Sequence, residues 1–194
     1  KADSVYFGVK AFNMRANAKS FEVGELKKIV KECHDNKVKA YLTLNTIIYD
    51  DEIKKVKHII KEAKKAKIDA IIAWDLSVIR ECKRLRLPVH ISTQASISNY
   101  EALKFFVKLG AERVVLAREL SLEQIKEIKK KARKEKLKVK LECFGHGAMC
   151  GSISGRCFLS QQIFRRSANR GDCLQPCRRE YIIKDNEEDH ELKL

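Results

Sequence analysis

Apolar runs of strand length alternate with amphipathic helical patterns along most of this 194-residue chain, and that alternation limits the folds open to it. The runs predict strands at residues 4–9, 39–45, 70–75, 89–93, 113–117 and 138–144. Between them apolar residues recur at helical spacing, as in Leu26, Ile29, Val30 and Cys33. Consecutive strands joined by a helical crossover pair in parallel. The sequence therefore predicts a parallel α/β fold.

Two parallel architectures accommodate this alternation, a doubly wound open sheet and a (β/α)8 TIM-type barrel. No glycine-rich phosphate loop follows the first strand, which argues against a dinucleotide-binding sheet. Most strands instead end in polar residues, which a barrel would gather on the face where active sites are built. These residues are Asn45, Asp75, Gln94, Arg118, Glu119 and Glu142. For this reason we favour the barrel. Only six strands are visible, so we expect the barrel to be incomplete in this chain.

The chain divides into three predicted parts. Residues 1–144 form the partial barrel, residues 145–181 a cysteine-rich segment, and residues 182–194 the start of a polar connection. One further strand is expected before Lys1 and another after the cysteine-rich segment. Helix caps are expected at Asp50 or Asp51, at Ser98 with Glu101, and at Ser121 with Gln124. Gly110 is expected to end the fourth helix.

Five of the seven cysteines lie in residues 142–181, a stretch with little helical or strand periodicity. Four of them follow the spacing C-x6-C-x15-C-x3-C: Cys150, Cys157, Cys173 and Cys177. The alternatives without a metal are that these cysteines are buried apolar thiols or form two disulfides. Zinc ligands usually pair at two to four residues' separation, which only the last two cysteines satisfy. Iron–sulfur clusters tolerate more varied spacing, so an iron–sulfur cluster is favoured over zinc.

The net charge of +15 suggests an anionic partner, with nucleic acid the first candidate, although a lysine-rich solvated helix face would also explain much of it. Arginines within the cysteine-rich segment point more specifically to phosphate, because the planar guanidinium matches it. The candidate contacts are Arg156, Arg165, Arg166 and Arg170. An odd number of cysteines beside a full apolar core favours a reducing cytoplasm. No apolar run reaches the length of a membrane helix.

Glu142 and His146 are the candidate catalytic residues, because they lie at and just beyond the end of the last predicted strand. Asn45, Gln94, Arg118 and Glu119 would line the same pocket, although the last two could simply pair with each other. The alternative for His146 is a structural role, as a loop histidine that hydrogen-bonds to the backbone. Ser152, Ser154, Ser160 and Cys143 are near His146 in sequence, but none lies in a nucleophile elbow, so the signal for a peptidase is poor.

Three stretches together resemble the signature of the collagenase-like peptidases, the U-thirty-two peptidase family. They are residues 142–150 (Glu-Cys-Phe-Gly-His-Gly-Ala-Met-Cys), 154–160 (Ser-Gly-Arg-Cys-Phe-Leu-Ser) and 169–178 (Asn-Arg-Gly-Asp-Cys-Leu-Gln-Pro-Cys-Arg). The strand ends at 5–8, 42–45, 92–94 and 117–121 match in the same order, so the resemblance covers nearly the whole chain.

The resemblance is nearest to the branch acting in hydroxylation of a tRNA wobble uridine or a ribosomal RNA cytidine. It implies an iron–sulfur cluster on the four cysteines and, in the tRNA branch, prephenate as a co-substrate. We therefore expect a cytoplasmic enzyme that hydroxylates an RNA base with a small-molecule oxygen donor. The alternatives are a peptidase using His146 and Glu142, or a non-catalytic RNA-binding module. The sequence does not indicate the oligomeric state.

Overall fold

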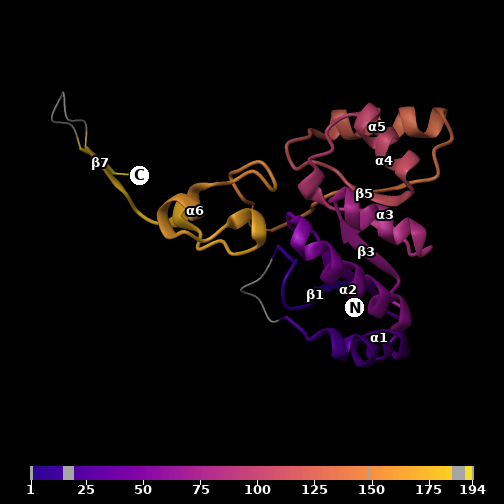
Figure 1. Ribbon diagram of the computed structural model, residues 1–194. Helices are drawn as coiled ribbons and strands as arrows, with labels where there is room; N and C mark the ends of the chain where they lie inside the picture. The colour runs from indigo at the N-terminus through magenta and orange to yellow at the C-terminus, as the bar shows by residue number, and fades with distance from the viewer. Residues whose placement is uncertain (1, 15–19, 148, 185–190, 194) are drawn as a thin grey trace.

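The computed structural model describes residues 2–14, 20–147, 149–184 and 191–193, and its centre is a six-stranded parallel sheet (Figure 1). The strands are β1 (Ser4–Gly8), β2 (Lys39–Leu44), β3 (Ala70–Ala73), β4 (Val89–Ile91), β5 (Ala111–Val115) and β6 (Lys140–Glu142). The connecting helices are α1 (Leu26–Asp35), α2 (Ile53–Lys65), α3 (Leu76–Arg84), α4 (Tyr100–Leu109) and α5 (Leu122–Lys134). The predicted parallel α/β fold is confirmed.

Strand order separates the two candidate architectures. Each strand pairs in parallel with the next one along the chain, from β1 to β6, without a reversal. Right-handed crossovers in an unreversed order place the helices on one face, whereas a doubly wound sheet reverses its order and carries helices on both. The sheet therefore curls into a half-barrel with α1 to α5 outside (Figure 1). Closure into an eight-stranded barrel stays a prediction.

The hydrophobic core lies between the convex face of the sheet and the helices. Leu42 and Leu44 of β2 are fully buried there, as are Ile71 of β3 and Ile91 of β4. Side chains alternate along a strand, so the neighbours of these residues face the concave side. The helices thus cover only the convex face of the sheet, and the more polar concave face is available to form a functional site.

Helix ends follow local chemistry, with two corrections to the predicted caps. Ser121 and Gln124 form the expected capping box, and Gly110 ends α4 at φ 106°, where a side chain would be strained. The prediction of Ser98 as the cap of α4 was wrong: the Asn99 carboxamide accepts a hydrogen bond from the Ala102 N–H at 2.9 Å. Asp50 and Asp51 do not cap α2, because they lie in the 3-10 turn η2 (Asp50–Glu52) that precedes it.

The cysteine-rich segment contains more regular structure than its sequence suggests. It holds the short helix α6 (Leu159–Phe164) and the 3-10 turns η4 (Ala168–Arg170) and η5 (Pro176–Arg178). The expected polar connection contains β7 (Ile182–Lys184) and β8 (Glu191–Lys193), which pair antiparallel. Residues 185–190 and 194 of that connection, and Ala148 of the signature stretch, lie outside the described residues.

Candidate functional site

The cysteine-rich segment docks on the carboxyl edge of the half-barrel, and Arg118 makes the first contact. Its guanidinium donates to the carbonyl oxygens of Cys150 (3.2 Å) and Ser152 (2.8 Å) and to the Ser154 hydroxyl (2.8 Å). The Ser96 hydroxyl also donates to the Ser154 carbonyl at 3.4 Å. Residues 150–154 are therefore held against the loops that follow β4 and β5.

Arg170 makes a second contact between the segment and the half-barrel, with partners more than a hundred residues before it in the sequence. It donates to the Ile47 carbonyl at 2.7 Å and grips both oxygens of the Glu52 carboxylate at 2.7 and 2.5 Å. Its guanidinium lies 4.6 Å from the centre of the Tyr49 ring. The hydrogen bonds from Arg170 lower the pKa of Glu52. This pair ties the segment to the loop after β2.

Two glycines allow the segment to approach the sheet closely. Gly155 (φ 73°) packs on Gln94, where an added Cβ would lie 2.8 Å from the side-chain oxygen. Gly171 (φ 87°) packs on the backbone of Asn13 and Met14, which leaves no space for a Cβ. With the two arginine contacts, the segment touches the loops after β1, β2, β4 and β5, and Figure 1 shows it beside one end of the sheet.

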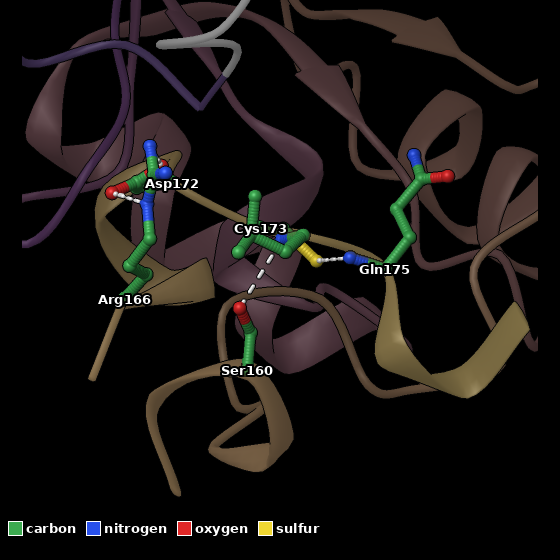
Figure 2. A network of polar contacts seen from close by, with 6 residues as sticks. Ser160, Arg166, Asp172, Cys173 and Gln175 are labelled. Carbon is green, nitrogen blue, oxygen red and sulfur yellow. Dashed lines mark hydrogen bonds and ion pairs between the residues drawn. The ribbon is translucent and has the colours of Figure 1, made fainter. Parts of the chain in front are cut away.

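Polar contacts also organise the inside of the segment (Figure 2). Arg166 forms a two-pronged ion pair with Asp172, at 2.7 and 2.6 Å. The fully buried Ser160 hydroxyl accepts from the Leu174 N–H at 3.1 Å. The buried Asn169 side chain likewise accepts from the Cys157 N–H at 2.9 Å. The loops that carry the cysteines are thus tied to each other as well as to the sheet.

The four cysteines suit an iron–sulfur cluster in their chemistry. None is in a disulfide, and the Cys173 sulfur accepts a hydrogen bond from the Gln175 N–H at 3.3 Å, the kind of contact that tunes a cluster thiolate (Figure 2). Their arrangement is not that of an assembled site: among the described residues no three His, Cys, Asp or Glu side chains are grouped to hold a metal ion. The donor set fits, and the four-cysteine site stays a prediction.

The concave face carries functional candidates that the sequence analysis missed. Arg113 of β5 donates to the Glu142 carboxylate at 3.0 Å, and its Nε is buried without a hydrogen-bond partner. His90 of β4 is buried edge-on against the Tyr41 ring, with 4.6 Å between ring centres. Burial, reinforced by the positive charge of Arg113, lowers the pKa of His90 to about 4, so the imidazole is neutral. Polar residues at alternate positions of buried strands were the available signal.

The predicted pocket residues have different surroundings. Asn45 accepts from the Met14 N–H and donates to the Ser92 hydroxyl, so its side chain joins three strand-end loops. Gln94 lies beneath Gly155. Glu119 is exposed, and the alternative that it simply pairs with Arg118 is not supported, because Arg118 bonds to residues 150–154 instead. His146 is exposed at the surface of the described structure.

The four candidate RNA-binding arginines fall into two groups. Arg156 and Arg165 are exposed. Arg166 and Arg170 use their guanidinium groups on Asp172 and Glu52, so protein acceptors occupy the donors that phosphate would need. Two shallow hollows among the described residues lie elsewhere. One is near Lys83 and Pro88 beside the start of β4, and the other is between α4 and α5; neither is lined by a predicted site residue.

The family model described as peptidase family U32 matches residues 1–193. The chain belongs to this family. A solved U32 peptidase, Mk0906, has a similar fold, with a TM-score of 0.59 and 18% identity over 73% of this chain and 60% of that one. The fold and the family thus agree with the resemblance in the cysteine-rich segment.

Relatives of this U32 chain carry two kinds of name. The "uncharacterized protease MJ0090" of Methanocaldococcus jannaschii is 50% identical over 94% of this chain and 44% of its own length. A "collagenase" of Porphyromonas gingivalis is 44% identical over 100% of this chain and 48% of its own length. The "tRNA hydroxylation protein P1" of Bacillus subtilis is 37% identical over 94% of this chain and 42% of its own length. The chain therefore spans less than half the length of these relatives. No helix in its described part is both long and apolar enough to span a membrane.

Proposed function

We propose that this chain is part of an iron–sulfur enzyme that hydroxylates an RNA base. The observation that carries the proposal is the docking of the cysteine-rich segment across four strand-end loops of a half-barrel with a polar concave face. The tRNA hydroxylation protein of B. subtilis is similar over 94% of this chain, including this segment. The charge of +15 and the exposed Arg156 and Arg165 suit an RNA substrate.

In this proposal Cys150, Cys157, Cys173 and Cys177 hold a 4Fe-4S cluster. Such a cluster supplies one-electron transfer when bound. The contacts of Arg118 and Arg170 keep the ligand loops against the strand ends, and the Gln175 N–H donates a hydrogen bond to the Cys173 sulfur. Thiolate ligation of this kind suits a reducing cytoplasm, which is the expected location.

The concave face would hold the small-molecule oxygen donor. Arg113 offers a buried N–H and orients the Glu142 carboxylate, so the pair can bind a polar group and accept a proton. His90 contributes a neutral imidazole. Conversion of a base C–H to C–OH oxidises the base by two electrons, and the donor is reduced by two electrons as it gives up its oxygen. Prephenate is the first donor to test.

The competing function is peptide hydrolysis, which two of the relatives' names suggest. A serine or cysteine peptidase needs a nucleophile hydrogen-bonded to a base. Here the buried Ser154 hydroxyl accepts from Arg118, and the Ser152 hydroxyl donates to the Ile153 carbonyl at 3.5 Å. Neither serine is paired with His146, so their geometry does not support a serine peptidase.

The deciding experiment compares RNA nucleosides from cells with and without the protein by mass spectrometry. We expect one tRNA or rRNA nucleoside to lose the mass of one oxygen atom, and Glu142→Gln or Arg113→Lys not to restore it. Glu112→Gln, at an exposed position of β5, is the matched control and should restore it. Purified protein that cleaves collagen or casein in a His146-dependent manner, with the nucleosides unchanged, would establish the peptidase instead.

The cluster is tested separately on anaerobically purified protein. Iron and sulfide should be present in about equal amounts, and serine at any of the four cysteines should remove both. Cys33→Ser is the control, because that cysteine packs against the core from α1. Stoichiometric zinc without sulfide would contradict the cluster.

A further inference from the structure

Helix α6 exposes an unusual amount of apolar surface. Phe158, at its start, is 66% exposed, and Leu159 and Ile163 are 41% and 46% exposed. Leu159 and Ile163 are four residues apart and so share one helix face, while Ser160 points inward and is fully buried. Large apolar side chains are mostly removed from water when a protein folds, so exposed ones grouped on one short element suggest a binding surface.

An ordered arginine lies beside this helix. The Arg179 guanidinium is stacked on the Phe164 ring at 4.5 Å from its centre, and the residue is exposed. The turn η5, next to Arg179, packs against α6. Contact with the ring restrains the guanidinium, and a planar, positively charged group of this kind can also contact the face of a base.

The charge of the surrounding segment favours an anionic partner over a protein surface of mixed charge. Residues 143–182 contain six arginines but only two acidic residues, Asp172 and Glu180. Asp172 is already paired with Arg166. Arg156, Arg165 and Arg178 are exposed on the same segment. Aromatic rings and guanidinium planes in a basic setting are the means by which proteins stack unpaired nucleobases.

We propose that α6 and Arg179 form a stacking platform, defined by Phe158, Leu159, Ile163 and Arg179, that binds unpaired bases of RNA. A base inside a duplex has both faces covered by its neighbours, so the platform selects loops and single strands. The inference rests on the proposed function and deepens it, because it names an unpaired stretch as the part of the RNA that this protein holds.

The test measures binding of the whole chain to labelled oligouridylate and to an RNA duplex of the same length, by fluorescence anisotropy. Phe158→Leu keeps an apolar side chain but removes the ring, and Arg179→Lys keeps the charge but removes the plane. Each should weaken single-strand binding about tenfold, the order expected for one lost stacked base, and leave duplex binding unchanged. Phe158→Tyr should bind as the unmodified chain does.

Two matched controls lie off the platform. Phe105 is an exposed phenylalanine on α4, and Arg178 is the exposed neighbour of Arg179. Phe105→Leu and Arg178→Lys should bind both RNAs normally. The inference is overturned if Phe158→Leu binds oligouridylate normally, if it weakens both RNAs equally, or if light scattering shows that it only converts a dimer of this chain to monomers.

Failure of the platform is distinguishable from failure of the hydroxylation proposal. If platform variants bind RNA normally and restore the hydroxylated nucleoside in cells, only the platform is wrong. If oligouridylate binding depends on Phe158 and Arg179 but no nucleoside changes mass in cells lacking the protein, the platform stands and the proposed function fails.

Discussion

Replacement of Arg170 by alanine should release the cysteine-rich segment from the half-barrel. The side chain makes three charge-assisted hydrogen bonds, two to the Glu52 carboxylate and one to the Ile47 carbonyl, and stacks on Tyr49. Its loss would also leave Glu52, whose side chain is only 18% exposed, without its cation. The docked state therefore loses an attractive interaction, and the partly buried carboxylate loses the cation that offsets its desolvation.

The size of the effect follows from these contacts. Each hydrogen bond to a charged group contributes about 1.5–3 kcal/mol, and a partly exposed cation–π contact about 0.5–1 kcal/mol. The terms do not add fully, because Arg170 is 27% exposed and water replaces part of what is lost. We expect the docked segment to be destabilised by about 2–3 kcal/mol, which corresponds to a roughly 30- to 150-fold increase in the population of the undocked form.

Amide hydrogen exchange followed by NMR measures this population directly. The N–H groups of Cys157 and Leu174 are suitable probes, because their acceptors, Asn169 and Ser160, are buried side chains of the segment. Their exchange should accelerate by the same 30- to 150-fold when it proceeds through opening of the docked state. The Ile71 N–H, bonded to the Pro88 carbonyl in the sheet, should exchange unchanged.

Arg156→Ala is the matched control, since Arg156 is an exposed arginine of the same segment. It should leave the exchange of Cys157 and Leu174 as it is. The docking argument is refuted if Arg170→Ala accelerates these amides less than about threefold, or if Arg156→Ala has the same effect. Arg170→Lys should fall between the two, because an ammonium keeps the charge but cannot grip both carboxylate oxygens.

Three further predictions concern ionisation. The pKa of Glu52 is lowered mainly by its hydrogen bonds from Arg170, so docking is stable above the ordinary glutamate range and weakens as the pH falls through the lowered value; exchange against pH should show this, and Arg170→Ala should abolish the dependence. The pKa of His90 is about 4 in the fold and 6.5 when unfolded, so the unfolded chain takes up the proton first, and stability to urea should fall as the pH is lowered from 6.5 to 4. A His90 resonance titrating near 6.5 in the native protein would contradict this. Burial raises the pKa of Cys82 to about 12, so a thiol reagent should leave it unmodified in the native protein and modify it once the protein is unfolded in urea.

The amino-acid sequence alone determined the order and type of the main elements. Strand and helix periods are local properties, and the buried positions of α2, such as Val56 and Ile60, repeat at the spacing that helical geometry requires. Parallel pairing followed as well, because a helix between two strands excludes a hairpin. Ser98 and Asn99 show the limit of local reasoning. Both are good caps, and only the backbone path shows that the Asn99 side chain reaches the Ala102 N–H.

The tertiary structure decided the architecture and the surroundings of the site. Alternation is compatible with either a doubly wound sheet or a barrel, and the unreversed strand order selects the half-barrel. Arg170 and Arg156 are equivalent in sequence terms, yet one is held by Glu52, 118 residues away, and the other is exposed. His90 and Arg113 lie within short buried strands and become site candidates only when the sheet curves around them. Contacts between distant residues depend on how the chain returns on itself, which no local pattern encodes.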